Sequence, residues 1–173
     1  MRYVSDTDLY KHFMDQAASL KSWQAGHVSP GTSRRYFDWL EFLVKGFWTY
    51  VLELARLSGD TTIYFCDLEQ ANATAFAKRF GVYPLIELET SMSESDYIAA
   101  LNREPGEVQG ETFAVSNTGS YLIFPPSGKW HVHGEYSIEM AELVSTVGVP
   151  ADETFPHDFW DEVEAMRRIG PDN

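Results

Sequence analysis

The chain of 173 residues has little of what several common protein classes require. It contains one cysteine, Cys66, so it can form neither a disulfide framework nor a cysteine-built zinc site. Its 13 Lys and Arg residues are outnumbered by 26 Asp and Glu residues, whereas a nucleic-acid-binding protein needs a basic face for the phosphates. These shortages exclude a disulfide-stapled domain, and we expect no nucleic acid as a partner.

Long apolar runs are also missing. The most apolar stretch, residues 36–57, is interrupted by charged side chains that would each be costly at the centre of a bilayer. The first ten residues lack the apolar region of a secretory signal. We therefore expect no membrane association and a cytoplasmic location, where a lone thiol stays reduced. With 44% hydrophobic residues the chain can bury a core, and we expect one domain over residues 1–173.

The common catalytic motifs are absent as well. The chain has no G-x-S-x-G, G-x-x-x-x-G-K-[ST], G-x-G-x-x-G or H-E-x-x-H sequence. These absences remove the usual hydrolase, nucleotide-binding and zincin interpretations. They favour a protein without chemistry of its own and do not exclude an enzyme.

The acidic residues are distributed unevenly. Residues 1–60 carry seven basic and seven acidic side chains, whereas residues 61–173 carry six and nineteen and hold the whole net charge of −13. Residues 130–166 include nine acids and neither Lys nor Arg. A field of one sign steers a basic partner toward its docking site, while an evenly solvated acidic surface would serve solubility alone.

Hydrophobic periodicity predicts helices in the neutral half, at 7–20 and 34–57, and shorter helices at 71–80 and 93–101. Strands are predicted at 61–66 and 82–89. The segments 112–116, 121–124 and 130–133 are separated by Gly-containing turns, which indicates an antiparallel meander at about 112–134.

Two C-terminal helices are predicted next. Residues 136–147 have apolar side chains at helical spacing, and residues 156–169 have acids early and arginines late, as the helix dipole favours. The resulting fold class is α+β. We expect a mixed or antiparallel sheet of about five strands, packed against the N-terminal helices and the two C-terminal helices.

The acid-rich segment supplies the first functional hypothesis, a binding surface. On the two predicted C-terminal helices, an aromatic anchor is accompanied by carboxylates that would attract a basic protein, and the candidate partner-binding residues are Glu135, Glu139, Glu142, Asp158, Trp160, Asp161 and Glu162. Packing of Trp160 in the core is the alternative. In its general character the chain looks like small acidic α+β immunity proteins, although it carries none of their diagnostic motifs. This likeness implies an inhibitor of a basic protein such as a bacterial toxin.

His131 and His133 supply the second hypothesis. Alternation along a strand puts both imidazoles on one face, with Trp130 and Val132 on the other. Together with Glu135 they could bind a divalent metal, which would make the protein a small metal-dependent enzyme or a metal-binding protein. Solvent-facing or hydrogen-bonded histidines without a metal are the alternative reading.

The predicted helix 34–57 is apolar around most of its circumference. Such a helix is either central to a core or buried against a partner. We therefore include a homodimer through helix 34–57 among the expected assemblies.

Overall fold

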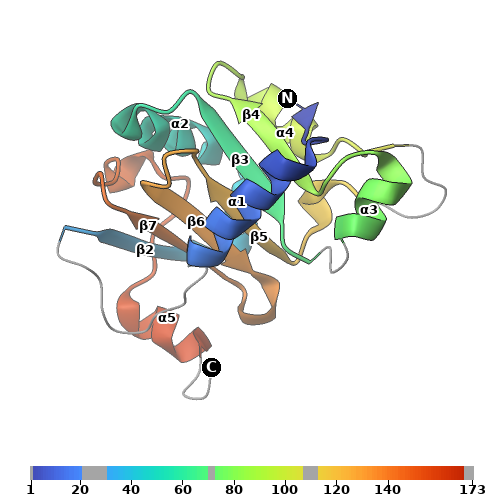
Figure 1. The fold of residues 1–173 in the computed structure, drawn as a ribbon. Helices are drawn as coiled ribbons and strands as arrows, with labels where there is room; N and C mark the ends of the chain where they lie inside the picture. Colours follow the sequence, from blue (N-terminus) through green and yellow to red (C-terminus); the bar gives the residue numbers. More distant parts are fainter. Residues whose placement is uncertain (1, 21–30, 70–72, 107–112, 170–173) are drawn as a thin grey trace.

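The computed structural model describes residues 2–20, 31–69, 73–106 and 113–169. Its centre is an antiparallel sheet of seven strands in the order β1-β4-β3-β5-β6-β7-β2 (Figure 1). The prediction of an α+β fold with an antiparallel sheet is confirmed, with seven strands instead of about five. In this order the strands are Arg2–Tyr3, Leu85–Glu89, Thr62–Asp67, Ser120–Phe124, Trp130–Glu135, Met140–Ser145 and Ser33–Asp38.

One face of the sheet is covered by α2 (Phe47–Ser58) and α4 (Glu94–Leu101). The largest core cluster lies here, and within it the Trp48 and Tyr97 rings stack with their centroids 4.6 Å apart. Ser93 begins α4 as its N-cap and forms a capping box with Asp96, which confirms the predicted start of this helix. Nowhere in the described ranges does a helix have the length and apolar character needed to cross a membrane.

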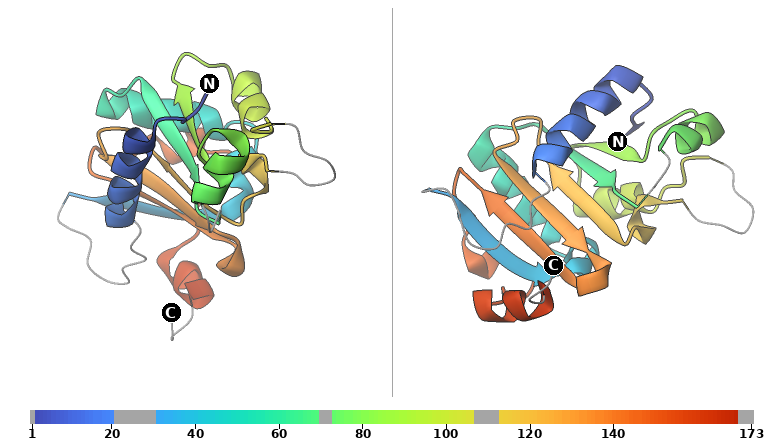
Figure 2. Two further views of the ribbon diagram at one scale, coloured as in Figure 1. Left: turned by 45° about the vertical axis from the view of Figure 1, so that its right-hand side comes forward. Right: turned by 60° about the horizontal axis from the view of Figure 1, so that its bottom comes forward.

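The opposite face is covered by two helices that lie apart from each other, α1 (Thr7–Leu20) and α5 (Glu162–Ile169) (Figures 1 and 2). From α1, Phe13 packs against Tyr64, with ring centroids 3.9 Å apart. From α5, Ala165 packs against Tyr36 and Met140. The middle of this face, between the two apolar clusters, belongs to β6. The remaining helix, α3 (Ala73–Phe80), lies between β3 and β4 in the chain.

The meander exists but is displaced along the chain. It consists of β5, β6 and β7, so its third strand lies within the segment 136–147 that was predicted to be a helix. That segment forms a 3-10 turn, η3 (Tyr136–Ile138), followed by β7. Because β7 lies between two strands and side chains on both its faces are buried, its apolar residues do not alternate as those of a half-exposed strand do. Of the predicted strand 112–116, residue 112 lies outside the described residues and the rest leads into a turn, η2 (Val115–Asn117).

The predicted helix 34–57 is also wrong. Its residues form β2, the 3-10 turn η1 (Trp39–Leu43) and α2, and Gly46 separates the turn from the helix with a φ of 101°. The aromatic side chains of α2, including Trp48 and Tyr50, are buried in the protein's own core. The continuous helix through which a homodimer was predicted is therefore not formed, while the homodimer itself stays a prediction.

Only one of the two predicted C-terminal helices is present among the described residues, because residues 136–147 form η3 and β7. This helix, α5, begins at Glu162 and not at residue 156. Asp161 caps it, since its Oδ1 accepts a hydrogen bond from the Glu164 amide at 2.8 Å. The preceding chain is tied to the sheet, because the Trp160 amide donates to the Tyr36 carbonyl at 2.8 Å. This tie covers part of the outer edge of β2.

Candidate functional site

The strand β6 places the two candidate histidines on one face, as expected. Val132 packs in the main core beside Leu143, so His131 and His133 point to the opposite face, between the clusters under α1 and α5. Both are buried, with exposed fractions of 8% and 6%. Directly across from His133 in the β6–β7 register is Glu142.

Glu142 is the acidic centre of this buried region. Its Oε1 lies 2.8 Å from Arg34 Nε, and its side chain is only 2% exposed. The two residues are diagonal neighbours on β7 and β2, because Arg34 faces Val144 and Tyr36 faces Glu142. Burial raises the pKa of Glu142 to about 7, although the Arg34 guanidinium and a hydrogen bond with Tyr36 act in the opposite direction.

Burial also shifts the pKa of His131, but it lowers this pKa instead of raising it. Burial, and next the neighbouring His133 and Arg34, lower the pKa of His131 to about 4, so its imidazole is neutral at pH 7. The region therefore holds one carboxyl that titrates near neutrality beside one imidazole that does not. Perturbed pKa values of this kind are found at catalytic sites and also in structural ion-pair networks. With Glu142 2% exposed, the network is enclosed and a substrate has no direct access to its carboxyl.

Glu135 does not complete a metal site with the histidines. Its carboxylate begins η3 as the N-cap, where Oε1 accepts from the Ser137 hydroxyl at 3.1 Å. Within the described ranges, no three His, Cys, Asp or Glu side chains gather closely enough to hold a metal ion. The predicted set of His131, His133 and Glu135 is therefore not assembled. The single cysteine, Cys66, is a buried free thiol under α1.

A hollow of about 430 Å³ lies beside the buried ion pair, between β2 and the chain that leads into α5. It brings together three predicted partner-binding residues, Trp160, Asp161 and Glu162. Its full lining is Arg34, Arg35, Tyr36, Asp152, Phe159, Trp160, Asp161 and Glu162. The two acids are exposed, and so is nearby Asp158 in the chain, whereas Trp160 is half-buried.

Arg168 links this hollow to the turn between β6 and β7. Its guanidinium carbon lies 4.1 Å from the centroid of the Trp160 ring, and its Nη1 lies 3.4 Å from Glu139 Oε2. Glu139 is therefore brought to the α5 region by tertiary contacts, not by the predicted helix. Glu142, in contrast, cannot present its charge to a partner, because it is enclosed against Arg34. Its inclusion among the predicted partner-binding residues is therefore a further correction.

No family model matches the chain, and no curated protein or solved structure is significantly similar to it. The chemistry of the candidate site therefore rests on its own residues.

The residues that sequence reasoning missed are those of β2. Arg34, Arg35 and Tyr36 line the hollow, and Arg35 Nε pairs with Asp152 Oδ1 at 3.2 Å. The sequence offered one signal for a strand here. Along a strand Arg34, Tyr36 and Asp38 lie on one face, and Arg35 and Phe37 lie on the other. The apolar residues that follow, up to residue 57, favour a helix, and the helix prediction was extended over β2 for that reason.

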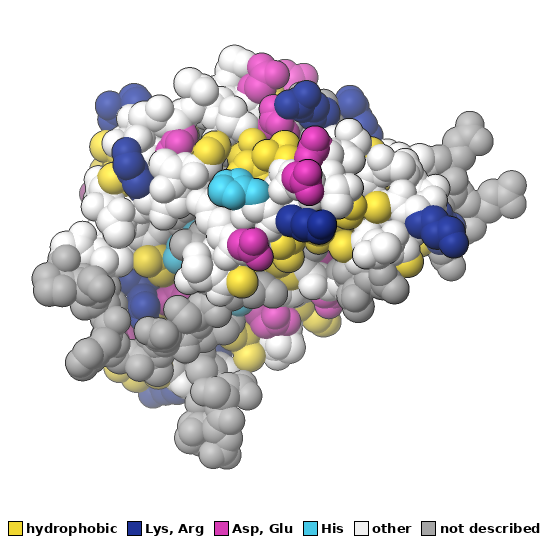
Figure 3. Space-filling model, viewed as in Figure 1, with side chains coloured by type: hydrophobic (Ala, Val, Ile, Leu, Met, Phe, Trp, Pro, Cys, Tyr) yellow, Lys and Arg dark blue, Asp and Glu magenta, His cyan; other side chains and the backbone are white. Residues whose placement is uncertain are grey.

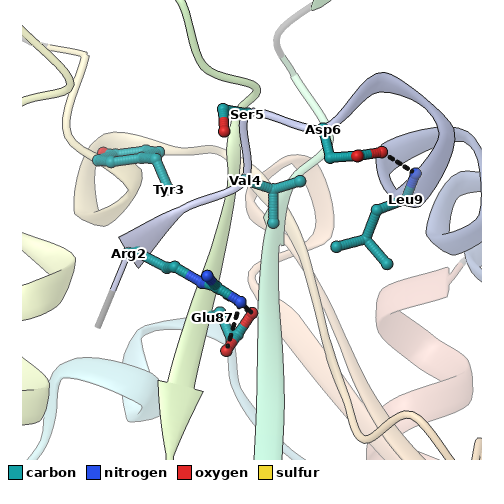
Figure 4. Close-up of a pocket in the computed structure, with 7 residues that line it drawn as sticks. All are labelled: Arg2, Tyr3, Val4, Ser5, Asp6, Leu9 and Glu87. Carbon is teal, nitrogen blue, oxygen red and sulfur yellow. Dashed lines mark hydrogen bonds and ion pairs between the residues drawn. The ribbon is translucent and has the colours of Figure 1, made fainter.

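A second hollow, of about 450 Å³, lies between β1 and the first turn of α1 (Figure 4). Its charged groups are engaged within the protein, since Arg2 donates to both carboxylate oxygens of Glu87 and Asp6 accepts a hydrogen bond from the Leu9 backbone amide. On the face of the molecule seen in Figure 3, acidic and basic side chains are interspersed. This hollow therefore does not belong to a field of one sign.

Proposed function

We propose that the protein is a binding protein without chemistry of its own, whose acidic surface binds a basic partner protein. We define the acidic surface as Glu135, Glu139, Asp158, Asp161 and Glu162. The observation that carries the proposal is that Asp161 and Glu162 line one hollow with the half-buried Trp160, and that Arg168 joins Trp160 to Glu139 at the β6–β7 turn. A partner with clustered Lys and Arg side chains would complement this charge.

The local charge balance supports this choice of partner. The basic side chains of this region are engaged in pairs, namely Arg34 with Glu142, Arg35 with Asp152, Arg167 with Glu164, and Arg168 with Glu139 and Glu164. In the described part of the chain, Asp158, Asp161 and Glu162 form no ion pair with a Lys or Arg. A net negative field therefore remains, which favours fast and salt-sensitive association with a cation-rich surface.

The most concrete form of the proposal is an inhibitor of immunity type, acting in the cytoplasm. A toxin that cleaves nucleic acid needs a basic cleft for the phosphates, and an acidic inhibitor can dock on that cleft. The net charge of −13 suits such a role.

The test is an affinity capture from the source lysate at low and at high salt, with identification of the eluted protein by mass spectrometry. The wild-type protein is compared with the triple variant Asp158→Asn, Asp161→Asn, Glu162→Gln. Asparagine at position 161 keeps an oxygen that can cap α5. We expect the wild type to retain a basic protein that salt releases, and the triple variant to lose it at physiological salt.

The matched control removes three exposed or half-exposed acids elsewhere, with Asp15→Asn, Glu53→Gln and Glu89→Gln on α1, α2 and β4. It changes the net charge equally, so it separates a local surface from the overall charge. Equal loss of capture by both triple variants, or a bound protein that salt does not release, would refute the proposal.

A further inference from the structure

Two 3-10 turns meet at one end of the sheet. The turn η1 follows β2, and η3 joins β6 to β7. Since Asp38 and Glu135 both face Met140 in the strand register, the starts of the two turns flank the same residue of β7. The right-hand view of Figure 2 shows the end of β2 and the β6–β7 connection at the same end of the sheet, with α5 close by.

Each turn begins at a carboxylate. Asp38 Oδ1 accepts from the Leu40 amide at 2.8 Å, and Glu135 Oε1 accepts from the Ser137 hydroxyl at 3.1 Å. No Lys or Arg of the described ranges forms an ion pair with either carboxylate. The structure thus places two carboxylates without a Lys or Arg partner from the described residues at the starts of the turns.

The residues that follow these carboxylates in the chain are apolar or aromatic, and some of them are exposed. The Trp39 and Tyr136 rings are in edge contact, with centroids 5.0 Å apart. Tyr136 is 58% exposed and Leu40 is 45% exposed, and they are two of the four large hydrophobic side chains that are exposed in the described part of the chain. We call Trp39, Leu40 and Tyr136 the turn ridge. Aromatic side chains that are partly supported and partly exposed are favoured anchors in interfaces.

The backbone of η3 adds an independent observation. Glu139 ends the turn with a φ of 51°, and among the described residues it is the only non-glycine residue with a positive φ. This left-handed conformation is unfavourable for an ordinary residue, and glycine or asparagine would adopt it more readily. At this position the Glu139 carboxylate lies 3.4 Å from Arg168 Nη1, so the strained residue ties the end of the turn to α5.

We infer that the turn ridge, with Asp38 and Glu135 at its base, is the anchor site for a segment of the basic partner that presents an apolar side chain next to Lys or Arg. This inference rests on the proposed function and adds to it the place and chemistry of the anchor. Charge complementarity selects this occupant over a second copy of the chain. A symmetric dimer through this surface would bring the carboxylates of both copies into one interface, where like charges repel.

The two parts of the surface then have different kinetic roles. Charges outside the contact, such as Asp158 and Asp161, accelerate association, whereas desolvated anchors slow dissociation. The turn ridge therefore governs the lifetime of the complex.

The experiment is site-specific photo-crosslinking of the full chain in the source lysate, with benzoylphenylalanine placed at one position at a time. The probe replaces Leu40 or Tyr136 on the turn ridge, Asp161 beside α5, or Leu57 on α2. Leu57 is a matched control, because it is another exposed apolar side chain, at 39%. We expect positions 40 and 136 to capture one basic protein through a segment with an apolar residue beside Lys or Arg, and position 57 not to capture it.

The other outcomes separate the two proposals. Capture of a basic protein at position 161 alone would overturn the turn ridge and leave the proposed function standing. Capture of a second copy of the chain at positions 40 and 136 would overturn the basic occupant. Absence of capture at 40, 136 and 161 would count against both proposals.

A kinetic measurement with the captured protein completes the test. Because Leu40 and Tyr136 are exposed, the double variant Leu40→Ser, Tyr136→Ser should fold. We expect it to dissociate at least ten times faster while the salt dependence of association is retained, and Leu57→Ser to behave as the wild type. Unchanged dissociation of the double variant would refute the inference.

Discussion

Arg34 and Glu142 form an ion pair across β2 and β7, with Nε and Oε1 2.8 Å apart and the carboxylate almost completely enclosed. An enclosed pair of this kind adds little net stability compared with apolar side chains, yet losing one partner leaves a buried charge. The pair therefore favours the observed register, in which Tyr36 faces Glu142 and Arg34 faces Val144. It also connects the interior of the sheet to the hollow beside α5, which Arg34 lines.

The first prediction compares two adjacent arginines of β2. Arg34→Ala should lower the free energy of unfolding by about 3 kcal/mol at pH 8, because it leaves the Glu142 carboxylate buried without a counter-ion. Arg35→Ala should cost about 0–1 kcal/mol, since Arg35 pairs at the surface with Asp152. Urea unfolding of both variants checks this. Equal costs would contradict the enclosed ion pair.

The second prediction follows from the pKa of Glu142, which burial raises from 4.5 to about 7. The folded state holds this proton more tightly than the unfolded state, so the contribution of Glu142 to stability is complete below pH 4.5 and is lost as the pH rises through 7. Glu142→Gln removes the titration. The stability of the wild type relative to this variant should therefore fall between pH 4.5 and pH 7 and then level off.

Urea unfolding at intervals of pH measures this difference, and carbon NMR of the glutamate carboxyls locates the titration directly. Parallel stability profiles for wild type and Glu142→Gln would show that Glu142 titrates alike in the folded and unfolded states.

The third prediction concerns His131, whose pKa is lowered from 6.5 to about 4, chiefly by burial. The unfolded state binds this proton more readily, so the stabilising contribution is complete above pH 6.5 and is lost as the pH falls through 4. Relative to His131→Gln, the wild type should lose stability over that range. Proton NMR should find the His131 imidazole neutral at pH about 5.5. A protonated ring at that pH would contradict its enclosure.

The fourth prediction concerns Gly134, whose backbone lies against the ring of Tyr121 on the neighbouring strand. A Cβ added to Gly134 would lie 2.2 Å from Cζ of Tyr121. The Tyr121 ring cannot retreat, because it is packed against Phe42 and Phe65 and its hydroxyl donates to the Trp39 carbonyl at 2.8 Å. Gly134→Ala should therefore lower the free energy of unfolding by about 3 kcal/mol.

Two further variants make that test specific. At Gly119 an added Cβ would meet the Oε1 of exposed Glu69 at 2.4 Å, and this flexible side chain can move away, so Gly119→Ala should cost less. In a Tyr121→Ala background, Gly134→Ala should cost little more, because the clash is gone. Equal costs of the two glycine substitutions in the wild type would contradict the assignment.

Local chemistry was sufficient for much of the fold. The capping pair Ser93 and Asp96, the β-branched and aromatic run of β3, and the turn residues around β5 and β6 each specify their element through neighbours in the chain. The strands β2 and β7 were not predictable in this way. They are paired with each other by residues far apart in sequence, and burial on both faces removed the alternation from β7.

The candidate site, like the fold, was predictable from the sequence in some features and not in others. The sequence by itself determined the acidic excess and, through the period of two, the common face of His131 and His133. Only the tertiary structure decided that this face is enclosed and that Glu142 meets Arg34 there, while Glu139 remains exposed at the turn. The physical reason is that exposure and pKa depend on which distant elements cover a side chain, and that information is not contained in the local pattern.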